Sequence, residues 1–91
     1  MGDRASAKVT IINRLGLHAR PAMTFVDLAG TFHSKITVAK GDTAVDGKSI
    51  MQMMMLAAGK GSELEITAEG PDAYAACTAL RALVQSGFDE D

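Results

Sequence analysis

The sequence predicts an α+β fold, a two-layer open-faced sandwich whose elements follow the order βαββαβα. Some segments alternate apolar and polar residues, as strands with one buried face do, and others space their apolar residues three and four apart, as amphipathic helices do. Each strand can turn a polar face to water, and each helix has a single apolar stripe. We therefore expect a four-stranded antiparallel sheet with three helices on its other face.

The first strand is predicted over residues 7–12, which alternate and are rich in β-branched side chains. Residues 13–16 then turn the chain. A helix follows over residues 19–32, and Gly30 with the polar residues after it indicates where that helix ends. Its apolar stripe consists of Ala22, Phe25, Val26, Ala29 and Phe32.

A hairpin and a short helix are expected next. Two alternating runs, residues 35–39 and 43–45, flank the turn residues KGD and are typical of a hairpin. Residues 49–58 contain no helix breaker. We expect them to form a helix that Ser49 caps and Gly59 closes.

Residues 63–69 alternate most regularly of all, with their acidic side chains facing water. The residues GPD then start a last helix, which Gly87 ends. Its buried stripe is predicted to be Ala76, Leu80, Leu83 and Val84. The acidic tail from Phe88 onward is expected to fray, so that the core spans about residues 7–88 and the tail residues 89–91.

Composition limits the classes of function. A chain of 91 residues with 47% hydrophobic and 22% charged residues is expected to form one domain, residues 1–91. A formal charge of -2 argues against nucleic acid or an anionic membrane surface as a partner. No secretory signal or long apolar span is present, so we expect a cytoplasmic protein. Cys77 is the only cysteine and is predicted to be buried, and no metal or cofactor is expected.

The stretch GLHARPA places chemistry at the start of the first predicted helix. If His18 immediately precedes that helix, Ala19, Arg20 and Pro21 occupy its first three positions, where proline loses no hydrogen bond. Free backbone N–H groups and the positive end of the helix dipole favour an anion there. Arg20 adds a charged group with several donors, which suits phosphate oxygens.

The positive field of the helix start disfavours a protonated ring, so we expect His18 to be a neutral nucleophile near pH 7. A neutral imidazole beside an anion pocket is suited to accept a phosphoryl group, because positioning and charge stabilisation supply most of the catalysis in such transfers. The alternative is that His18 only caps the helix and Arg20 is a solvated surface charge. The residues alone leave both interpretations open.

Several motifs together resemble one family. LGLHARPA, VDGKSIMQMMMLAAGKG and ELEITAEGPD, followed by a final helix, are similar to the HPr family of bacterial phosphocarriers from about Lys8 to Gly87. The resemblance implies strand order 1-4-2-3 with three helices on one face. It implies that phospho-enzyme I, which draws on phosphoenolpyruvate, phosphorylates His18 on Nδ1, and that the group passes to an enzyme IIA-type protein. Arg20 matches the family's active-site arginine, beside the backbone amide of Ala19.

Gly47-Lys48-Ser49 suggests a P-loop, but five residues separate Gly41 from Gly47 where that loop requires four. The resemblance implies instead that HPr kinase/phosphorylase modifies Ser49. It also implies that partner proteins dock on an apolar patch supplied here by Ile50, Met51 and Met54. The segment SIMQMMML holds four of the six methionines, too many for one buried face, so we expect some to be exposed.

Two other functions remain open from the sequence. A regulatory relative would use phosphorylation of His18 or Ser49 to change what it binds, and a stand-alone small-molecule binding module would have no use for His18. Within the family, LVQSGFDED and AEGPD resemble the nitrogen-related (NPr) branch, whereas VDGKSIM resembles members that are kinase targets. We expect a monomer, and we expect His33 to be a surface residue without a role as acceptor.

Overall fold

The structure, a computed structural model, describes residues 3–90. The elements follow the predicted order βαββαβα and end in one turn of 3-10 helix. They are β1 (Asp3–Thr10), α1 (Ala19–Ala29), β2 (Lys35–Lys40), β3 (Thr43–Asp46), α2 (Ile50–Met55), β4 (Glu63–Gly70), α3 (Ala73–Gln85) and the 3-10 helix Gly87–Asp89.

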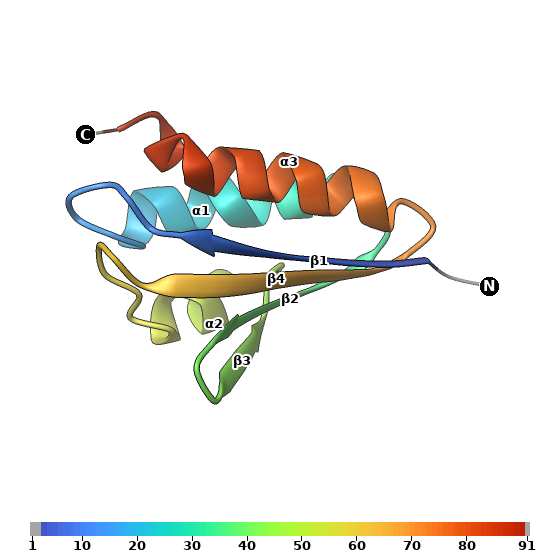
Figure 1. Ribbon diagram of the computed structural model, residues 1–91, viewed down its shortest axis with the longest axis horizontal. Coiled ribbons are helices and arrows are strands. Elements are labelled where there is room, and N and C mark those ends of the chain that lie inside the picture. Colours follow the sequence, from blue (N-terminus) through green and yellow to red (C-terminus); the bar gives the residue numbers. More distant parts are fainter. Residues whose placement is uncertain (1–2, 91) are drawn as a thin grey trace.

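The four strands form one antiparallel sheet in the order β1-β4-β2-β3, which confirms the expected topology. β4 lies inside the sheet because its inward-facing residues are all apolar and its two edges pair with β1 and β2. Helices α1 and α3 lie side by side over one face, and α2 lies beside α1 next to the edge strand β3 (Figure 1). Within residues 3–90, no helix combines the length and apolar character needed to cross a bilayer.

The core lies between this helical layer and the sheet. Its largest fully buried side chains include Phe25 of α1, Ile36 of β2, Leu64 and Ile66 of β4, and Leu80 of α3. The predicted helix stripes are correct in outline. Ala22, Phe25 and Ala29 are buried, as are Ala76, Leu80 and Val84, whereas Val26, Phe32 and Leu83 are half-buried.

Two predicted boundaries are wrong at the strand that precedes the first loop. β1 begins at Asp3 and ends at Thr10, earlier at both ends than the predicted 7–12. Ile11 leaves the ladder because its N–H donates to Ser62 O at 2.9 Å and its carbonyl accepts from Gly61 N at 2.8 Å. The apolar residue is buried, but its backbone bonds to a loop.

The first helix ends where Gly30 indicated, and the second is shorter than predicted. α1 ends at Ala29, with Gly30 as its C-cap, so Phe32 lies beyond it. α2 ends at Met55 instead of residue 58, because Ala57 turns the chain with a φ of 50°. Lys40 Nζ donates to the carbonyls of Leu56 and Ala57 at 3.4 and 3.3 Å and so satisfies the acceptors at this helix end.

The C-terminal segment is ordered through Glu90, contrary to the expected fraying. Gly87 turns the chain with a φ of 70°, and the Phe88 side chain, 6% exposed, is buried in the core. The acidic composition suggested a solvated tail, but burial of this one aromatic ring fixes the segment. Glu90 is thereby held against the loop that precedes α1.

Asp72, immediately before α3, holds the chain that leaves α1. Its carboxylate accepts hydrogen bonds from Ser34 Oγ at 2.5 Å, Ser34 N at 2.9 Å and His33 N at 2.8 Å. The hydrogen bond from the Ser34 hydroxyl, followed by that from the His33 amide, lowers the pKa of Asp72 from 3.8 to about 2. The ionised carboxylate therefore stabilises the folded state.

We expect Asp72→Asn to lower the melting temperature at pH 7 by several degrees. A group whose pKa is lowered on folding contributes stability above its unfolded pKa and loses it as the pH falls through the folded value. The difference between variant and parent should therefore shrink from pH 4 towards pH 2, the interval set by the shift from 3.8 to about 2. Thermal unfolding followed across this interval tests it, with Asp27→Asn on the exposed face of α1 as control. A difference that stays constant with pH would contradict this account.

Candidate functional site

The loop before α1 is held in a tight turn. Gly16 has a φ of +66°, and a Cβ there would lie 2.6 Å from the carbonyl oxygen of Ala58, so only glycine fits. Leu17 N donates to the same carbonyl at 2.8 Å, and Gly16 N donates to Asn13 O at 3.1 Å. The turn predicted over residues 13–16 is thus packed against the chain that follows α2.

α1 begins at Ala19, as predicted, with His18 in the N-cap position. The first intrahelical bond runs from Ala22 N to His18 O at 3.0 Å, so the N–H groups of Ala19 and Arg20 have no acceptor within the helix. Pro21 has no N–H group to leave unpaired. The His18 ring makes no capping hydrogen bond to the helix, which contradicts the alternative in which this side chain is only a cap.

The ring of His18 bonds to the C-terminal segment. His18 Nε2 and Glu90 Oε1 lie 2.8 Å apart, with the side chains 35% and 15% exposed. Asn13 Nδ2 donates to the same carboxylate oxygen at 2.9 Å and to Gly16 O at 2.7 Å. An ionised carboxylate can only accept, so Nε2 carries the hydrogen and, in a neutral ring, Nδ1 keeps a free lone pair.

The electrostatics favour this arrangement at neutral pH. The hydrogen bond from His18 lowers the pKa of Glu90 below its ordinary value of 4.5, and burial opposes it. The bond from Asn13 and the charges of Arg20 and of a protonated His18 act in the lowering direction. Glu90 is therefore ionised well below pH 7. The argument from sequence considered only the positive helix start. Glu90 adds a negative charge on the other side of the ring, so the neutral state of His18 stays a prediction.

A surface depression of about 210 Å³ opens beside the ring, lined by Arg14, Leu15, His18, Arg20 and Glu90. Two guanidinium groups border it, one from the loop and one from the first turn of α1. Among residues 3–90, neither arginine has a carboxylate within 4.0 Å. An anion in this depression would meet the two arginines and, on the other side of the ring, the Glu90 carboxylate. The unbonded amides of the helix start add donors beside it.

The sequence analysis did not identify four of the residues around His18 as site residues. Asn13, Arg14 and Leu15 were interpreted only as a turn, and Glu90 as part of a frayed tail. Asn13 is in fact 1% exposed, and its Oδ1 has no partner among the described residues. Glu90 is separated from His18 by 72 positions, and no local pattern in the sequence connects them.

The second motif is a helix cap, as predicted. Ser49 is half-buried, and its Oγ accepts from Gln52 N at 3.2 Å. Lys48 Nζ donates to Phe32 O at 2.7 Å, and Gly47 is packed against Ile36, so these residues do not form a phosphate-binding loop.

The methionines divide as expected between core and surface. Met53 is fully buried, whereas Met51 is 76% exposed and Met54 is 43% exposed. Ile50, the third residue of the predicted docking patch, is half-buried. Met55, which was not assigned to that patch, is 75% exposed.

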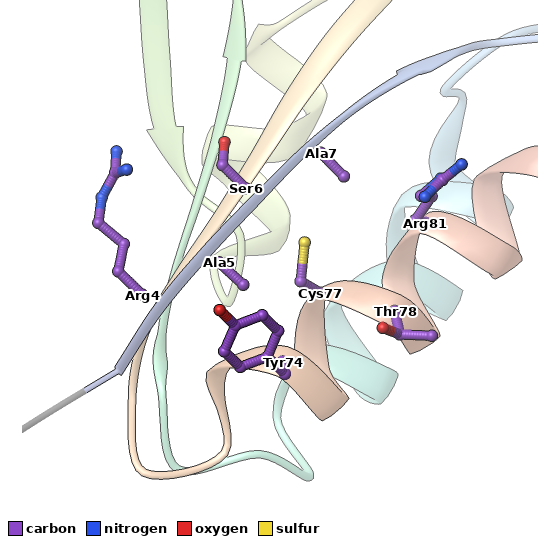
Figure 2. Close-up of a pocket in the computed structure, with 8 residues that line it drawn as sticks. All are labelled: Arg4, Ala5, Ser6, Ala7, Tyr74, Cys77, Thr78 and Arg81. Carbon is purple, nitrogen blue, oxygen red and sulfur yellow. The ribbon is translucent and has the colours of Figure 1, made fainter.

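The remaining candidates lie elsewhere. His33 is exposed, and Cys77 is buried at 5% exposure, both as predicted. A larger groove of about 300 Å³ runs between β1 and α3, with Tyr74, Cys77, Thr78 and Arg81 on its helical side (Figure 2). It shares no lining residue with the depression at His18. Within residues 3–90, no cluster of three or more histidine, cysteine or acidic side chains could hold a metal ion.

Comparisons with known proteins agree on one family. The family model described as "PTS HPr component phosphorylation site" matches residues 5–86. The phosphocarrier protein HPr of Treponema pallidum is 48% identical over 91% of this chain and 94% of that protein. The phosphocarrier protein NPr of Proteus mirabilis is 45% identical over 92% and 94%. The crystal structure of HPr-C-His from Thermoanaerobacter tengcongensis, 41% identical, superposes with a TM-score of 0.92 over 96% of this chain and 98% of that one.

Proposed function

Because the chain belongs to the HPr family and is a phosphocarrier of the phosphotransferase system, we propose that His18 Nδ1 accepts the phosphoryl group. The donor is phospho-enzyme I, and the acceptor in the next step is a histidine of an enzyme IIA-type protein. The protein acts in the cytoplasm as a monomer. It is a relay that is charged and discharged in turn, so it needs to bind the phosphoryl group without holding it permanently.

The observation that carries this assignment is the hydrogen bond between His18 Nε2 and Glu90 at 2.8 Å. It directs the ring hydrogen to Nε2 and leaves Nδ1 as the nucleophile. In the transfer, a bond forms between Nδ1 and phosphorus while the bond from phosphorus to the donor breaks. The phosphoryl oxygens face the amides of Ala19 and Arg20 and the Arg20 guanidinium, and Glu90 balances the positive charge that develops on the ring.

The direct test mixes the protein with phosphoenolpyruvate, Mg²⁺ and an enzyme I and follows its mass. One phosphoryl group should be gained, and it should be lost in acid and kept in base, as expected for phosphohistidine. Adding an enzyme IIA-type protein should then remove it. A chain that gains no phosphoryl group under these conditions would be a binding module of the same fold.

We expect Glu90→Gln to slow phosphoryl transfer by about ten- to a hundredfold, the effect that removing the orienting partner of a metal-ligating histidine has at metal sites. A neutral amide can accept from or donate to Nε2, so the ring should populate both tautomers. Nitrogen-15 NMR of the imidazole measures this directly, and the ring of His33 serves as the internal control. Unchanged tautomers together with an unchanged rate would show that Glu90 does not orient His18.

We also propose that Ser49 is a regulatory phosphorylation site for a kinase of the HPr kinase/phosphorylase type. Support comes from its half-buried position as N-cap of α2, directly before the proposed docking residues Ile50 and Met51. Phosphate there would add about -1.5 to -2 charges beside an apolar patch and make its desolvation on docking costly.

Ser49→Asp should accordingly raise the KM of enzyme I for this protein and leave kcat unchanged, because the new charge lies at the docking patch. The rise should be only several-fold, because one carboxylate carries less charge than phosphate. The matched control is Thr78→Asp, which places the same charge on the exposed face of α3. The regulatory role would be refuted by equal KM values in the two variants, or by a fall in kcat without a change in KM.

A second candidate function is regulation of partners in the nitrogen-related branch, without sugar uptake as the main output. The 45% identity to the NPr of Proteus mirabilis supports it, and the slightly higher identity to the Treponema HPr supports the first. A pull-down from cell extract with the phosphorylated and the unmodified protein separates them. Recovery of regulatory proteins by one form only would favour the second function.

A further inference from the structure

The helix pair beside His18 carries an unusual density of exposed thioethers. Met51 and Met55 of α2 are 76% and 75% exposed, Met54 is 43% exposed, and Met23 of α1 is 56% exposed. Met53, in the middle of the same run, is fully buried. Of the five methionines in these two helices, four are exposed to solvent and one is buried.

The helices that carry these thioethers adjoin the proposed site of transfer. Helix α2 contacts α1, whose N-cap is His18. The chain just after α2 is bonded to the loop before α1 through Leu17 N and Ala58 O at 2.8 Å. Met51 and Met54 belong to the patch on which partners are proposed to dock. A chemical change of the exposed thioethers would thus act at the contact with partner proteins and leave the reacting groups intact.

We propose that Met51, Met54 and Met55 form a modification site at which peroxide produces methionine sulfoxide and thereby weakens docking of the phosphotransferase partners. This inference rests on the proposed carrier function, since docking is what it modulates. Methionine sulfoxide reductase, with electrons from a thiol reductant, returns the sulfoxide to the thioether and releases the oxygen as water. Met53, shielded in the core, is not part of the site.

The chemistry is balanced with hydrogen peroxide as the only co-reactant. The thioether sulfur attacks one peroxide oxygen, the O–O bond breaks, and an S–O bond forms. The sulfur loses two electrons, and the other oxygen leaves as water after taking up the proton. Cys77 competes poorly for the oxidant, because burial raises the pKa of its thiol and so leaves little thiolate, and because the side chain is only 5% exposed.

The sulfoxide alters docking for a plain physical reason. A methionine side chain is flexible and apolar, and its desolvation favours association with an apolar partner surface. The sulfoxide oxygen is a strong hydrogen-bond acceptor whose desolvation is costly unless the partner offers a donor. Because His18, Arg20 and Glu90 are untouched, the effect belongs in KM and not in kcat.

The first measurement is site occupancy. The folded protein is treated with hydrogen peroxide for increasing times, quenched, and analysed by peptide mass spectrometry. Met51 and Met55 should oxidise first, followed by Met23 and Met54, whereas Met53 should stay reduced until the protein is unfolded. Equal rates at Met53 and Met51 would overturn the proposal, because selective access is its premise.

The second measurement is kinetic. The untreated protein is first shown to accept phosphate from enzyme I, and failure at this stage would count against the carrier function itself. After oxidation, the KM of enzyme I for the protein should rise about tenfold or more, with kcat retained, and methionine sulfoxide reductase should restore it. Sulfoxide at the patch with an unchanged KM would overturn the proposal.

Variants separate the patch from the rest of the chain. The triple variant Met51→Leu, Met54→Leu, Met55→Leu keeps apolar side chains of similar volume that peroxide cannot oxidise. Its KM after treatment, compared with its own untreated value, should not change. The control Met53→Leu should keep the full sensitivity of the parent. Loss of activity on oxidation of the triple variant would place the sensitive group elsewhere and contradict the proposal.

Discussion

Replacing His18 by alanine is expected to abolish phosphorylation by phospho-enzyme I completely. The other side chains around the depression are two arginines, a leucine and the Glu90 carboxylate. An acyl phosphate on Glu90 would be lost in base, where phosphohistidine is kept, so the two acceptors are told apart by their stability. Arginine stays protonated and is no nucleophile at neutral pH. A mass gain should therefore be undetectable in His18→Ala, in contrast to the slowed but measurable transfer expected for variants of the surrounding residues.

The matched control is His33→Ala, which removes the other histidine of the chain. His33 is exposed, and only its backbone N–H makes a described contact, with Asp72 at 2.8 Å. The control should therefore be phosphorylated at the rate of the parent, and both variants should unfold at nearly the parent's melting temperature. If His18→Ala still gained a phosphoryl group, or if His33→Ala no longer did, the assignment of His18 as the acceptor would be wrong.

The sequence predicted those parts of the site that depend on neighbours in the chain. The start of α1 at Ala19 follows from Pro21, which fits only the first turn of a helix, and from the change of apolar spacing after it. The cap at Ser49 follows from a hydroxyl three residues before the amide that it accepts from. In both cases the partners lie within one turn, where the geometry is fixed by the backbone.

The Glu90 contact could not be predicted in this way. It forms because Gly87, Phe88 and Asp89 adopt positive φ values of 70°, 59° and 58° and fold the chain back over its own core. For Phe88 and Asp89 this conformation is unfavourable, and tertiary packing of the Phe88 ring supports it. Composition and periodicity indicate neither the positive φ values nor the packing of Phe88. The acidic segment was therefore predicted to be a solvated tail, although it is ordered.

The predicted ends of α2 and β1 were wrong for a related reason. The run MQMMMLAA has high helix propensity throughout, yet α2 stops at Met55, where Lys40 binds the carbonyls that follow. Ile11 has the β-branched shape of a strand residue but bonds to the loop at Gly61 and Ser62. In each case a distant backbone or side-chain partner overrides the local preference.

Removal of the Arg20 guanidinium is expected to have the second largest effect. Arg20→Ala should slow phosphoryl transfer by about a hundred- to a thousandfold, the usual cost of losing one preorganised donor to a developing anion. Arg20→Lys should recover only part of the rate, since an ammonium keeps the charge but not the two-pronged geometry that matches phosphate oxygens. Rapid-quench measurement of the first turnover with phospho-enzyme I provides the comparison. Arg81→Ala, exposed on α3 and outside the depression, is the control that should react normally.

A double variant gives the sharper form of this test, because Arg20 and Glu90 border the same depression with opposite charges. In the parent, Arg20 offsets the repulsion between the Glu90 carboxylate and the incoming phosphoryl oxygens. Once Arg20 is removed that repulsion is unscreened, so Glu90→Gln should cost less in the Arg20→Ala background than in the parent. Two rate effects that multiply independently would mean that the residues do not act on the same anion, and the depression would then not be the place where the phosphoryl group binds.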